Sequence, residues 1–364
     1  MNTHESKGLP WIFAVLVAVL VCVMGLVIAR MLVRPENNSL DRATLLPCTS
    51  SQTVSVLDKG VVYSDGTSLR ALNAGGRQIW SYVIGANCQF SVGGGYVAGW
   101  SNDLLVVLNA SSGDVLFSAS LSEVILSATV GETYTAAQVG EESDSTLIVL
   151  DRNGREIDRV AQSDVTVLDF GFFSGGNMLY VMAMDTNGTV PMSLLTTYRP
   201  GRMQAGSITD SEQVIYEAMF EASNVTAVGT TYARVYDYTG TEQAAKRRLV
   251  YGWQLIDSDA TRSGTLMAFA PMAEIDATAH ISDVRMIMGG TDKTVRMPFV
   301  CFDLAVHGDA VYGFSENYAM VYGISDSRAT SYHLPFTCDG LIGVTSDGNA
   351  VLVSGDSIYL VAMP

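Results

Sequence analysis

The sequence predicts an all-β fold, an eight-bladed β-propeller preceded by one N-terminal transmembrane helix, and three observations support this prediction. Nineteen residues from Trp11 to Ala29 contain no charge and no proline. After them the chain consists of short segments rich in Val, Ile, Tyr, Phe and Thr, separated by turn sequences such as SDGTS, ASSG and RNG. Similar segments recur about every 40 residues, a period typical of one four-stranded unit repeated around an axis.

The apolar segment near the N-terminus predicts a membrane-spanning helix over residues 11–33, after a short tail of residues 1–10. At about 1.5 Å per residue it nearly matches the roughly 30 Å hydrocarbon layer. Trp11 is expected at one membrane interface, and Arg30 and Arg34 at the other. A cleaved signal peptide is the alternative, although its apolar region would be only about 7 to 15 residues long.

The charge of the chain bears on its orientation and its partners. Lys7 before the helix is outnumbered by Arg30 and Arg34 after it, so the positive-inside rule mildly favours a cytoplasmic domain. Large domains are translocated largely regardless of charge, and we expect the tail inside and the domain outside the cell membrane. Without those three residues and Glu5, 18 basic and 36 acidic residues give a net charge of −18, which argues against nucleic-acid binding. The one basic cluster, residues 246–248, is interpreted as a charged strand edge.

Residues 34–42 are expected to form a linker, and residues 43–364 the propeller. The last repeat supplies only three strands, so residues 43–51 are expected to donate the fourth, because ATLLPCTSS resembles SYHLPFTCD at 331–339. Seven blades are the alternative, since residues 200–275 are the least regular, and no helix is expected after Val33. The innermost strands are predicted to begin near Val54, Cys88, Val124, Val165, Val214, Trp253, Cys301 and Cys338.

Two repeats, ALNAGGRQIW at 71–80 and VLNASSGDVLF at 107–117, resemble the PQQ-like (quinoprotein-type, BamB-like) propeller repeat, whose signature is Ala-x-Asp-x-x-Thr-Gly-x-x-x-Trp. The resemblance implies that an Asx–Gly pair forms a hairpin turn and that an aromatic residue packs between blades. The anchored, acidic layout is also similar to membrane-anchored propellers of unknown function from Gram-positive bacteria. The repeat motif is carried by Asn73, Gly76 and Trp80, by Asn109, Gly113 and Phe117, and by Asp151 and Gly154.

The sequence shows no recognisable catalytic, cofactor or metal site. Quinoprotein dehydrogenases of this family use an adjacent cysteine pair, and no two cysteines are adjacent here. The four histidines lack metal-ligand spacing. Asp151 with Asn153 resembles a calcium-loop spacing, but a hairpin turn explains it, and Asp257 with Asp259 lacks the ligand count of a calcium site. We therefore expect no catalytic residue, no cofactor and no metal.

Four cysteines fall where an innermost strand is expected to begin, in four consecutive blades. We interpret them as small buried residues of the channel wall, and a disulfide or a thiol–metal site is the alternative. They are Cys48, Cys88, Cys301 and Cys338.

These features favour a non-enzymatic protein-interaction scaffold in the cell envelope, with one membrane helix and an unidentified protein partner. The alternative is a ligand-sensing or carbohydrate-binding module at the channel mouth, for which Trp100 and Trp253 are the candidate aromatic residues. An enzyme whose site is assembled from scattered loops is a third possibility, because a fold does not by itself define an activity.

Overall fold

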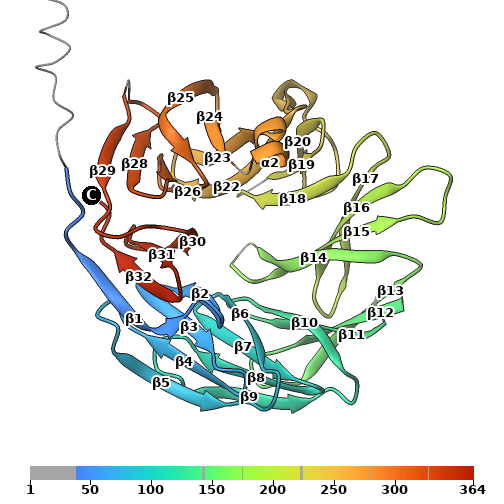
Figure 1. The fold of residues 1–364 in the computed structure, drawn as a ribbon. Coiled ribbons are helices and arrows are strands. Elements are labelled where there is room, and N and C mark those ends of the chain that lie inside the picture. The colour runs from blue at the N-terminus through green and yellow to red at the C-terminus, as the bar shows by residue number, and fades with distance from the viewer. Residues whose placement is uncertain (1–37, 142–143, 174, 222–223, 279, 327) are drawn as a thin grey trace, which may run out of the picture. The chain divides into compact units, whose positions relative to one another are not determined.

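The computed structural model describes residues 38–141, 144–173, 175–221, 224–278, 280–326 and 328–364. The chain divides into two units, Met1–Ser39 and Leu40–Pro364. The second unit is a ring of eight four-stranded antiparallel sheets (Figure 1), which confirms the eight-bladed propeller. The predicted helix over 11–33 lies outside the described residues, as do its proposed interface residues Trp11, Arg30 and Arg34. Within the described ranges, no helix has the length and apolar character needed to cross a bilayer.

Seven blades each consist of four consecutive strands that run from the channel to the rim of the ring. Blades 1 to 3 contain β2 (Thr53–Leu57), β3 (Gly60–Ser64), β4 (Ser68–Leu72) and β5 (Gln78–Val83); β6 (Gln89–Gly93), β7 (Tyr96–Ser101), β8 (Leu104–Asn109) and β9 (Val115–Ser120); and β10 (Ile125–Val130), β11 (Thr135–Glu141), β12 (Asp144–Leu150) and β13 (Glu156–Ser163). Blades 4 and 5 contain β14 (Thr166–Phe173), β15 (Met178–Asp185), β16 (Met192–Arg199) and β17 (Met203–Asp210); and β18 (Ile215–Phe220), β19 (Asn224–Gly229), β20 (Tyr232–Asp237) and β21 (Arg248–Leu249). Blades 6 and 7 contain β22 (Trp253–Thr261), β23 (Gly264–Pro271), β24 (Ile281–Met288) and β25 (Thr291–Cys301); and β26 (Asp303–His307), β27 (Ala310–Phe314), β28 (Tyr318–Gly323) and β29 (Thr330–His333).

Blade 8 joins the two ends of the propeller sequence. Its inner strands are β30 (Gly340–Val344), β31 (Ala350–Ser354) and β32 (Ser357–Val361), and its outermost strand is β1 (Ala43–Thr49). β1 is antiparallel to β32, with Ala43 opposite Val361. β1 therefore occupies the position predicted for residues 43–51.

The hydrophobic core lies between neighbouring blades. The second and third strands of a blade are buried on both faces, which explains continuous apolar runs such as GVVYS in β3 and LLVVLN in β8. One cluster joins Trp100 and Leu105 of blade 2 to Ala137 and Val139 of blade 3. The first and fourth strands have partly exposed side chains, and the first strands surround the channel.

The repeat motif forms the turn between the third and fourth strands. Oδ1 of Asn109 accepts hydrogen bonds from the backbone N–H groups of Ser111 at 2.9 Å and Ser112 at 3.1 Å, and Gly113 follows with φ of +74°. A Cβ at Gly113 would lie 2.5 Å from Cγ of Trp80 in the preceding blade, and Trp80 Nε1 donates to the carbonyl of Ala110 at 2.8 Å. The same turn contains Asn73 and Gly76, Asp151 and Gly154, and a further pair, Asp237 and Gly240. Phe117 packs against Gly154 as Trp80 packs against Gly113.

Two short helices depart from the prediction that no helix follows Val33. Helix α2 (Met272–Thr278) connects β23 to β24, and the 3₁₀ helix η1 (Ala244–Lys246) precedes β21. The prediction was wrong because seven residues make only about two turns, too few for an apolar period of 3.6 to be visible in the sequence.

Candidate functional site

The wall of the central channel carries a one-sided charge. The first strands of the eight blades form this wall, and all of their residues are described by the structure. These strands hold five carboxylates and no lysine or arginine, and the carboxylates come from four consecutive blades. They are Asp169 in β14, Glu217 in β18, Asp257 and Asp259 in β22, and Asp303 in β26.

Two of these carboxylates connect blade 6 to blade 7. Oδ2 of Asp257 accepts a hydrogen bond from the backbone N–H of Val306 at 2.7 Å, and Oδ2 of Asp259 accepts one from Gly308 at 2.8 Å. Oδ1 of Asp257 also accepts from the N–H of Ser258 at 2.8 Å. Neighbouring blades share no backbone ladder, so these carboxylates satisfy N–H groups at the blade boundary. They have a structural role and bring negative charge to the channel.

The electrostatic environment of the wall disfavours further negative charge. Burial raises the pKa of Asp257, and the charge of Asp259 adds to this effect, while the backbone hydrogen bonds oppose it. Burial raises the pKa of Asp303, with a contribution from the charge of Asp257. Burial likewise raises the pKa of Glu217, and the charges of Asp169 and Asp257 add to it. A cation at this wall would relieve the repulsion among these groups.

Two hollows lie where the first strands of the blades end, and we call them together the channel mouth. The first has a volume of about 530 Å³ and is lined by residues of β2, β22, β26 and β30, among them Ser55, Asp257, Asp259 and His307. The second has a volume of about 430 Å³ and lies at blades 2, 3 and 4. Glycines of three hairpins line the second hollow beside Asp169, Phe172, Phe173 and Tyr180.

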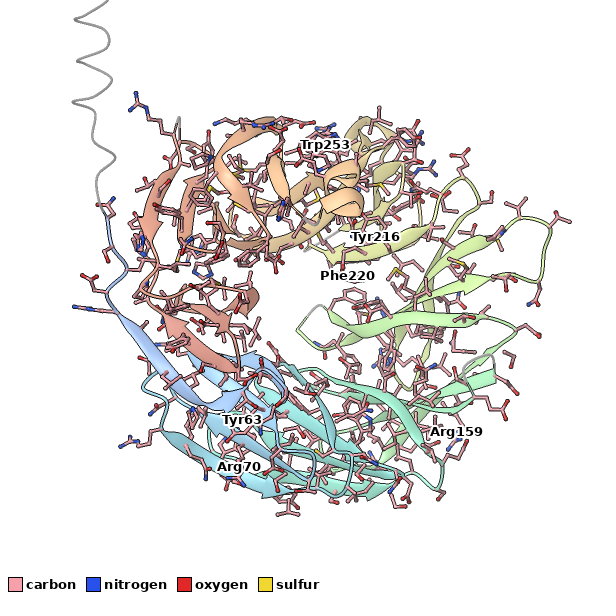
Figure 2. All side chains as sticks on the ribbon, viewed as in Figure 1. Tyr63, Arg70, Arg159, Tyr216, Phe220 and Trp253 are labelled. Atoms are coloured by element: carbon pink, nitrogen blue, oxygen red, sulfur yellow. The ribbon has the colours of Figure 1, made fainter. Side chains whose placement is uncertain are left out.

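An aromatic group adjoins the carboxylates of blades 4 and 5. The rings of Phe173 and Phe220 stack with centroids 4.0 Å apart, and Tyr180 packs against Phe220 at 4.7 Å. The hydroxyl of Tyr180 donates to Oδ2 of Asp169 at 2.7 Å. Burial and the charge of Asp169 raise the pKa of Tyr180, so it stays protonated and remains a donor. Figure 2 shows Tyr216 and Phe220 beside the central opening.

The channel carboxylates are distributed rather than clustered. Over the described ranges, no three His, Cys, Asp or Glu side chains come close enough together to hold a metal ion. Since the charges are spread over four blades, the wall suits a ligand whose positive charge is spread along its length. The sequence offered a signal for this site, because an acidic residue recurs near the start of each innermost strand from blade 4 to blade 7.

The four cysteines lie in four different hydrophobic clusters between blades. All four thiols are free, and the side chains are between 0% and 6% exposed. Burial raises the pKa of Cys48, Cys88 and Cys338 to about 11, and that of Cys301 to about 12. Cys48 belongs to β1 and Cys301 ends β25, so both lie on outermost strands. Cys88 immediately precedes the first strand of blade 2, and Cys338 lies two residues before the first strand of blade 8.

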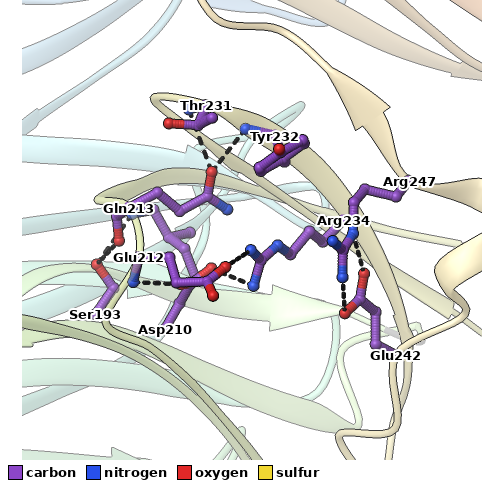
Figure 3. Close-up of polar contacts among 10 residues, drawn as sticks. Ser193, Asp210, Glu212, Gln213, Thr231, Tyr232, Arg234, Glu242 and Arg247 are labelled. Carbon is purple, nitrogen blue, oxygen red and sulfur yellow. Dashed lines mark hydrogen bonds and ion pairs between the residues drawn. The ribbon is translucent and has the colours of Figure 1, made fainter.

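A buried ion-pair network between blades 4 and 5 could not be recognised in the sequence (Figure 3). Nη1 of Arg234 in β20 lies 3.1 Å from Oδ2 of Asp210 at the end of β17, and Arg234 also pairs with Glu212. Oε1 of Gln213 accepts hydrogen bonds from the N–H groups of Thr231 at 3.2 Å and Tyr232 at 2.7 Å. The network stabilises the contact between the two blades and is not part of the channel mouth.

Trp100 and Trp253, the candidate sugar-binding aromatic residues, are packing residues. Trp100 is 7% exposed and belongs to the cluster between blades 2 and 3. Trp253 packs against the core cluster of blades 5 and 6, and the Arg285 guanidinium lies 6.0 Å from its ring centroid.

Known proteins resemble this chain in structure. No family model and no curated protein matches the sequence. BamB from Moraxella catarrhalis has a TM-score of 0.53 at 12% identity, over 89% of this chain and 100% of that one. The C-terminal WD40 domain of Sif2 has a TM-score of 0.61 at 11% identity (88% and 99%), and Sqt1 from Saccharomyces cerevisiae has 0.59 at 10% (90% and 100%). These likenesses show that the chain shares the β-propeller fold of BamB and of WD40 domains.

Proposed function

We propose that this chain is a membrane-anchored propeller with PQQ-like repeats, located outside the cytoplasm, that acts as a non-enzymatic scaffold in the cell envelope. In this proposal the channel mouth binds a basic, extended segment of a partner protein. The observation that carries it is the channel wall, whose eight strands hold five carboxylates and no lysine or arginine. The apolar segment over 11–33 supports the anchor, and the folds of BamB and of WD40 domains support a scaffold.

Charge and geometry favour an extended cationic segment over a point charge. The net charge of the chain is −16, so the long-range field attracts cations toward the ring. Deeper along the channel wall, the raised pKa of Glu217 and of Asp303 reflects burial and repulsion that a bound Lys or Arg would reduce. An extended peptide can contact several blades at once, whereas a compact ion would neutralise only one or two carboxylates.

The test is direct binding of a fluorescent decapeptide of alternating Lys and Gly to the full-length protein in detergent, followed by anisotropy. The double variant Asp169→Asn with Glu217→Gln removes two channel charges. We expect the Kd to rise about 5- to 30-fold, because each pair at a partly exposed site contributes about 0.5–1 kcal/mol. The effect should shrink at high salt, which screens such pairs.

The matched control is Asp114→Asn with Glu316→Gln, which removes two exposed carboxylates outside the channel mouth. The control should change the Kd by less than twofold. Equal weakening in both double variants would mean that the peptide senses only net charge, and that result would overturn the channel mouth as the binding site. No binding of the peptide at low salt would overturn it as well.

A second function, carbohydrate or ligand binding at the channel mouth, is favoured by the aromatic lining of the hollow at blades 2 to 4. Phe172 and Tyr180 lie there beside glycine backbone, an arrangement that admits a flat apolar face. Thermal-shift measurements with N-acetylglucosamine and with glucose test this function. A saturable shift that Tyr180→Ala abolishes and Tyr82→Ala, on the outermost strand β5, retains would support it over the scaffold.

A further inference from the structure

A separate cavity of about 270 Å³ lies between blades 5 and 6 and shares no lining residue with the channel mouth. It exists because the outermost strand of blade 5 is unusually short. β21 pairs with β20 only through Leu249 opposite Tyr232 and Arg248 opposite Ala233. The helix η1 covers the rest of this edge, and it contributes Lys246 to the lining.

The inner walls of this cavity are apolar. Ala233 and Val235 are two residues apart on β20 and therefore share one face of blade 5. Met267 and Ile287 are cross-strand partners on the facing side of blade 6. Ala233, Met267 and Ile287 are 2%, 9% and 2% exposed, so an apolar ligand would be largely removed from water between these faces.

Two cations line the outer edge of the cavity. Within the described part of the chain, neither Lys246 nor Arg248 forms an ion pair. Arg247 lies between them in sequence, but both of its hydrogen bonds to Glu242 are 2.8 Å long, and its charge is neutralised. Arg248 donates from Nη1 to the carbonyl of Arg247 at 3.3 Å, and its charge helps to lower the pKa of Asp292, which is itself paired with Arg285. The basic cluster that the sequence suggested to be a strand edge thus places two cations without a direct ion pair at a cavity.

The one carboxylate of the cavity lies at its other end. Glu221 accepts hydrogen bonds at Oε1 from the N–H of Thr265 at 3.2 Å and from its hydroxyl at 2.9 Å. In the register of blade 5, Arg248 is opposite Ala233. Glu221 directly follows Phe220, and Phe220 is at the level of Tyr236, because both are opposite Val225. Three residues of strand separate the two levels by about 10 Å. Glu221 is therefore separated from Arg248 along the cavity, and the walls combine the apolar side chains with the hydroxyls of Thr226, Ser263 and Thr265.

We propose that this cavity binds a small organic anion with an apolar body, specifically a carboxylate with an unbranched aliphatic chain. The carboxylate pairs with Lys246 and Arg248, and the chain lies between the apolar faces of blades 5 and 6. The cavity volume of about 270 Å³ equals that of about nine water molecules at about 30 Å³ each, so the cavity accommodates about eight or nine non-hydrogen atoms. This binding is independent of the scaffold function, because it uses different residues.

The test is calorimetric titration of the full-length protein in detergent with butanoate, hexanoate and octanoate, and with hexanol as the uncharged comparison. We expect the Kd to fall about fourfold per added methylene up to about nine non-hydrogen atoms and then to level off. Hexanol should bind at least tenfold more weakly than hexanoate. Equal affinity for hexanol and hexanoate, or no dependence on chain length, would overturn the proposal.

Variants locate the site. Lys246→Gln with Arg248→Gln should weaken hexanoate binding at least tenfold, and Arg77→Gln with Arg202→Gln, which changes the net charge equally at exposed positions of other blades, should leave it within twofold. Because all four positions are at least partly exposed, both double variants are expected to fold, and thermal unfolding verifies this. Equal loss in both would show nonspecific charge attraction and refute the site. The Lys–Gly peptide should bind both of these double variants as it binds the wild type. Peptide binding therefore separates this result from the test of the channel mouth.

Discussion

Replacement of Arg234 by methionine tests how the ring holds blades 4 and 5 together. The Arg234 side chain is 8% exposed and that of its partner Asp210 is 1% exposed, whereas Glu212 is 72% exposed. Methionine retains much of the apolar stem and removes the charge. The variant therefore leaves Asp210 buried without its cation, and this is the costly outcome for a buried ion pair.

The expected loss in the free energy of unfolding is large for one substitution. Removal of one partner of a buried pair costs about 3–5 kcal/mol, and the exposed Glu212 adds less than about 1 kcal/mol. An unfolding entropy of about 2.1 cal/mol/K per residue over about 300 residues gives about 0.6 kcal/mol/K, so the melting temperature should fall by about 5–8 °C. Adding Asp210→Asn to Arg234→Met removes the unpaired charge and should restore at least half of this loss.

The assay is thermal unfolding of both variants followed by circular dichroism. The matched control is Arg70→Met, which breaks a 2.9 Å ion pair with Asp65 whose side chains are 41% and 23% exposed. This control should lower the melting temperature by less than about 2 °C. An Arg234→Met variant that melts as the control does, or a double variant no more stable than the single one, would refute the reasoning.

Three further predictions concern the turns, the thiols and the channel wall. Gly113→Ala should cost about 1–3 kcal/mol more than Gly95→Ala in urea unfolding, because both have positive φ (+74° and +81°) but only the first places a Cβ against Trp80; equal costs would contradict the packing. The four buried thiols should resist iodoacetamide at neutral pH and react in urea, with the same count with and without reductant, since burial raises their pKa to about 11 or 12. Burial raises the pKa of Glu217, so the folded state binds more protons than the unfolded state, and stability should fall as the pH rises toward neutral. The melting temperature of the Glu217→Gln variant should therefore depend less on pH than that of the wild type, and an unchanged pH profile would contradict this.

The architecture was predictable because its determinants are local. Four of the turns that follow a third strand are encoded by an Asx–Gly pair such as Asn109 with Gly113, and the apolar strands between turns recur about every 40 residues. The first strands of the blades consequently begin close to the predicted residues: β6 begins at Gln89, expected near Cys88, and β26 begins at Asp303, expected near Cys301.

The sites were less predictable because they combine residues from different blades. Arg234 and Asp210 belong to different blades, as do the channel carboxylates, and these residues come together only when the blades are aligned. No local sequence pattern indicates that they lie close to one another. The carboxylates could have been found by comparing the predicted first strands with one another, because Asp169, Glu217 and Asp257 lie at similar distances from the predicted strand starts. In the structure, each of them follows a bulge of the first strand. The cavity of blades 5 and 6 depends on the two-residue length of β21, which lies in the irregular stretch over 200–275.

The pairing of β1 with β32 also determines the order in which the ring can be completed during synthesis. Seven blades form from contiguous chain, but β1 is made before them and its partner strand is made after them. Until then, Leu46 of β1 and Val61 of blade 1 lack the Ile358 side chain with which they form a core cluster. Ring closure is therefore the late, long-range step of folding, although its entropic cost grows only with the logarithm of the intervening length. A ribosome-bound chain without β32 exposes two open blade faces, so ring closure has to wait until β32 has been synthesised.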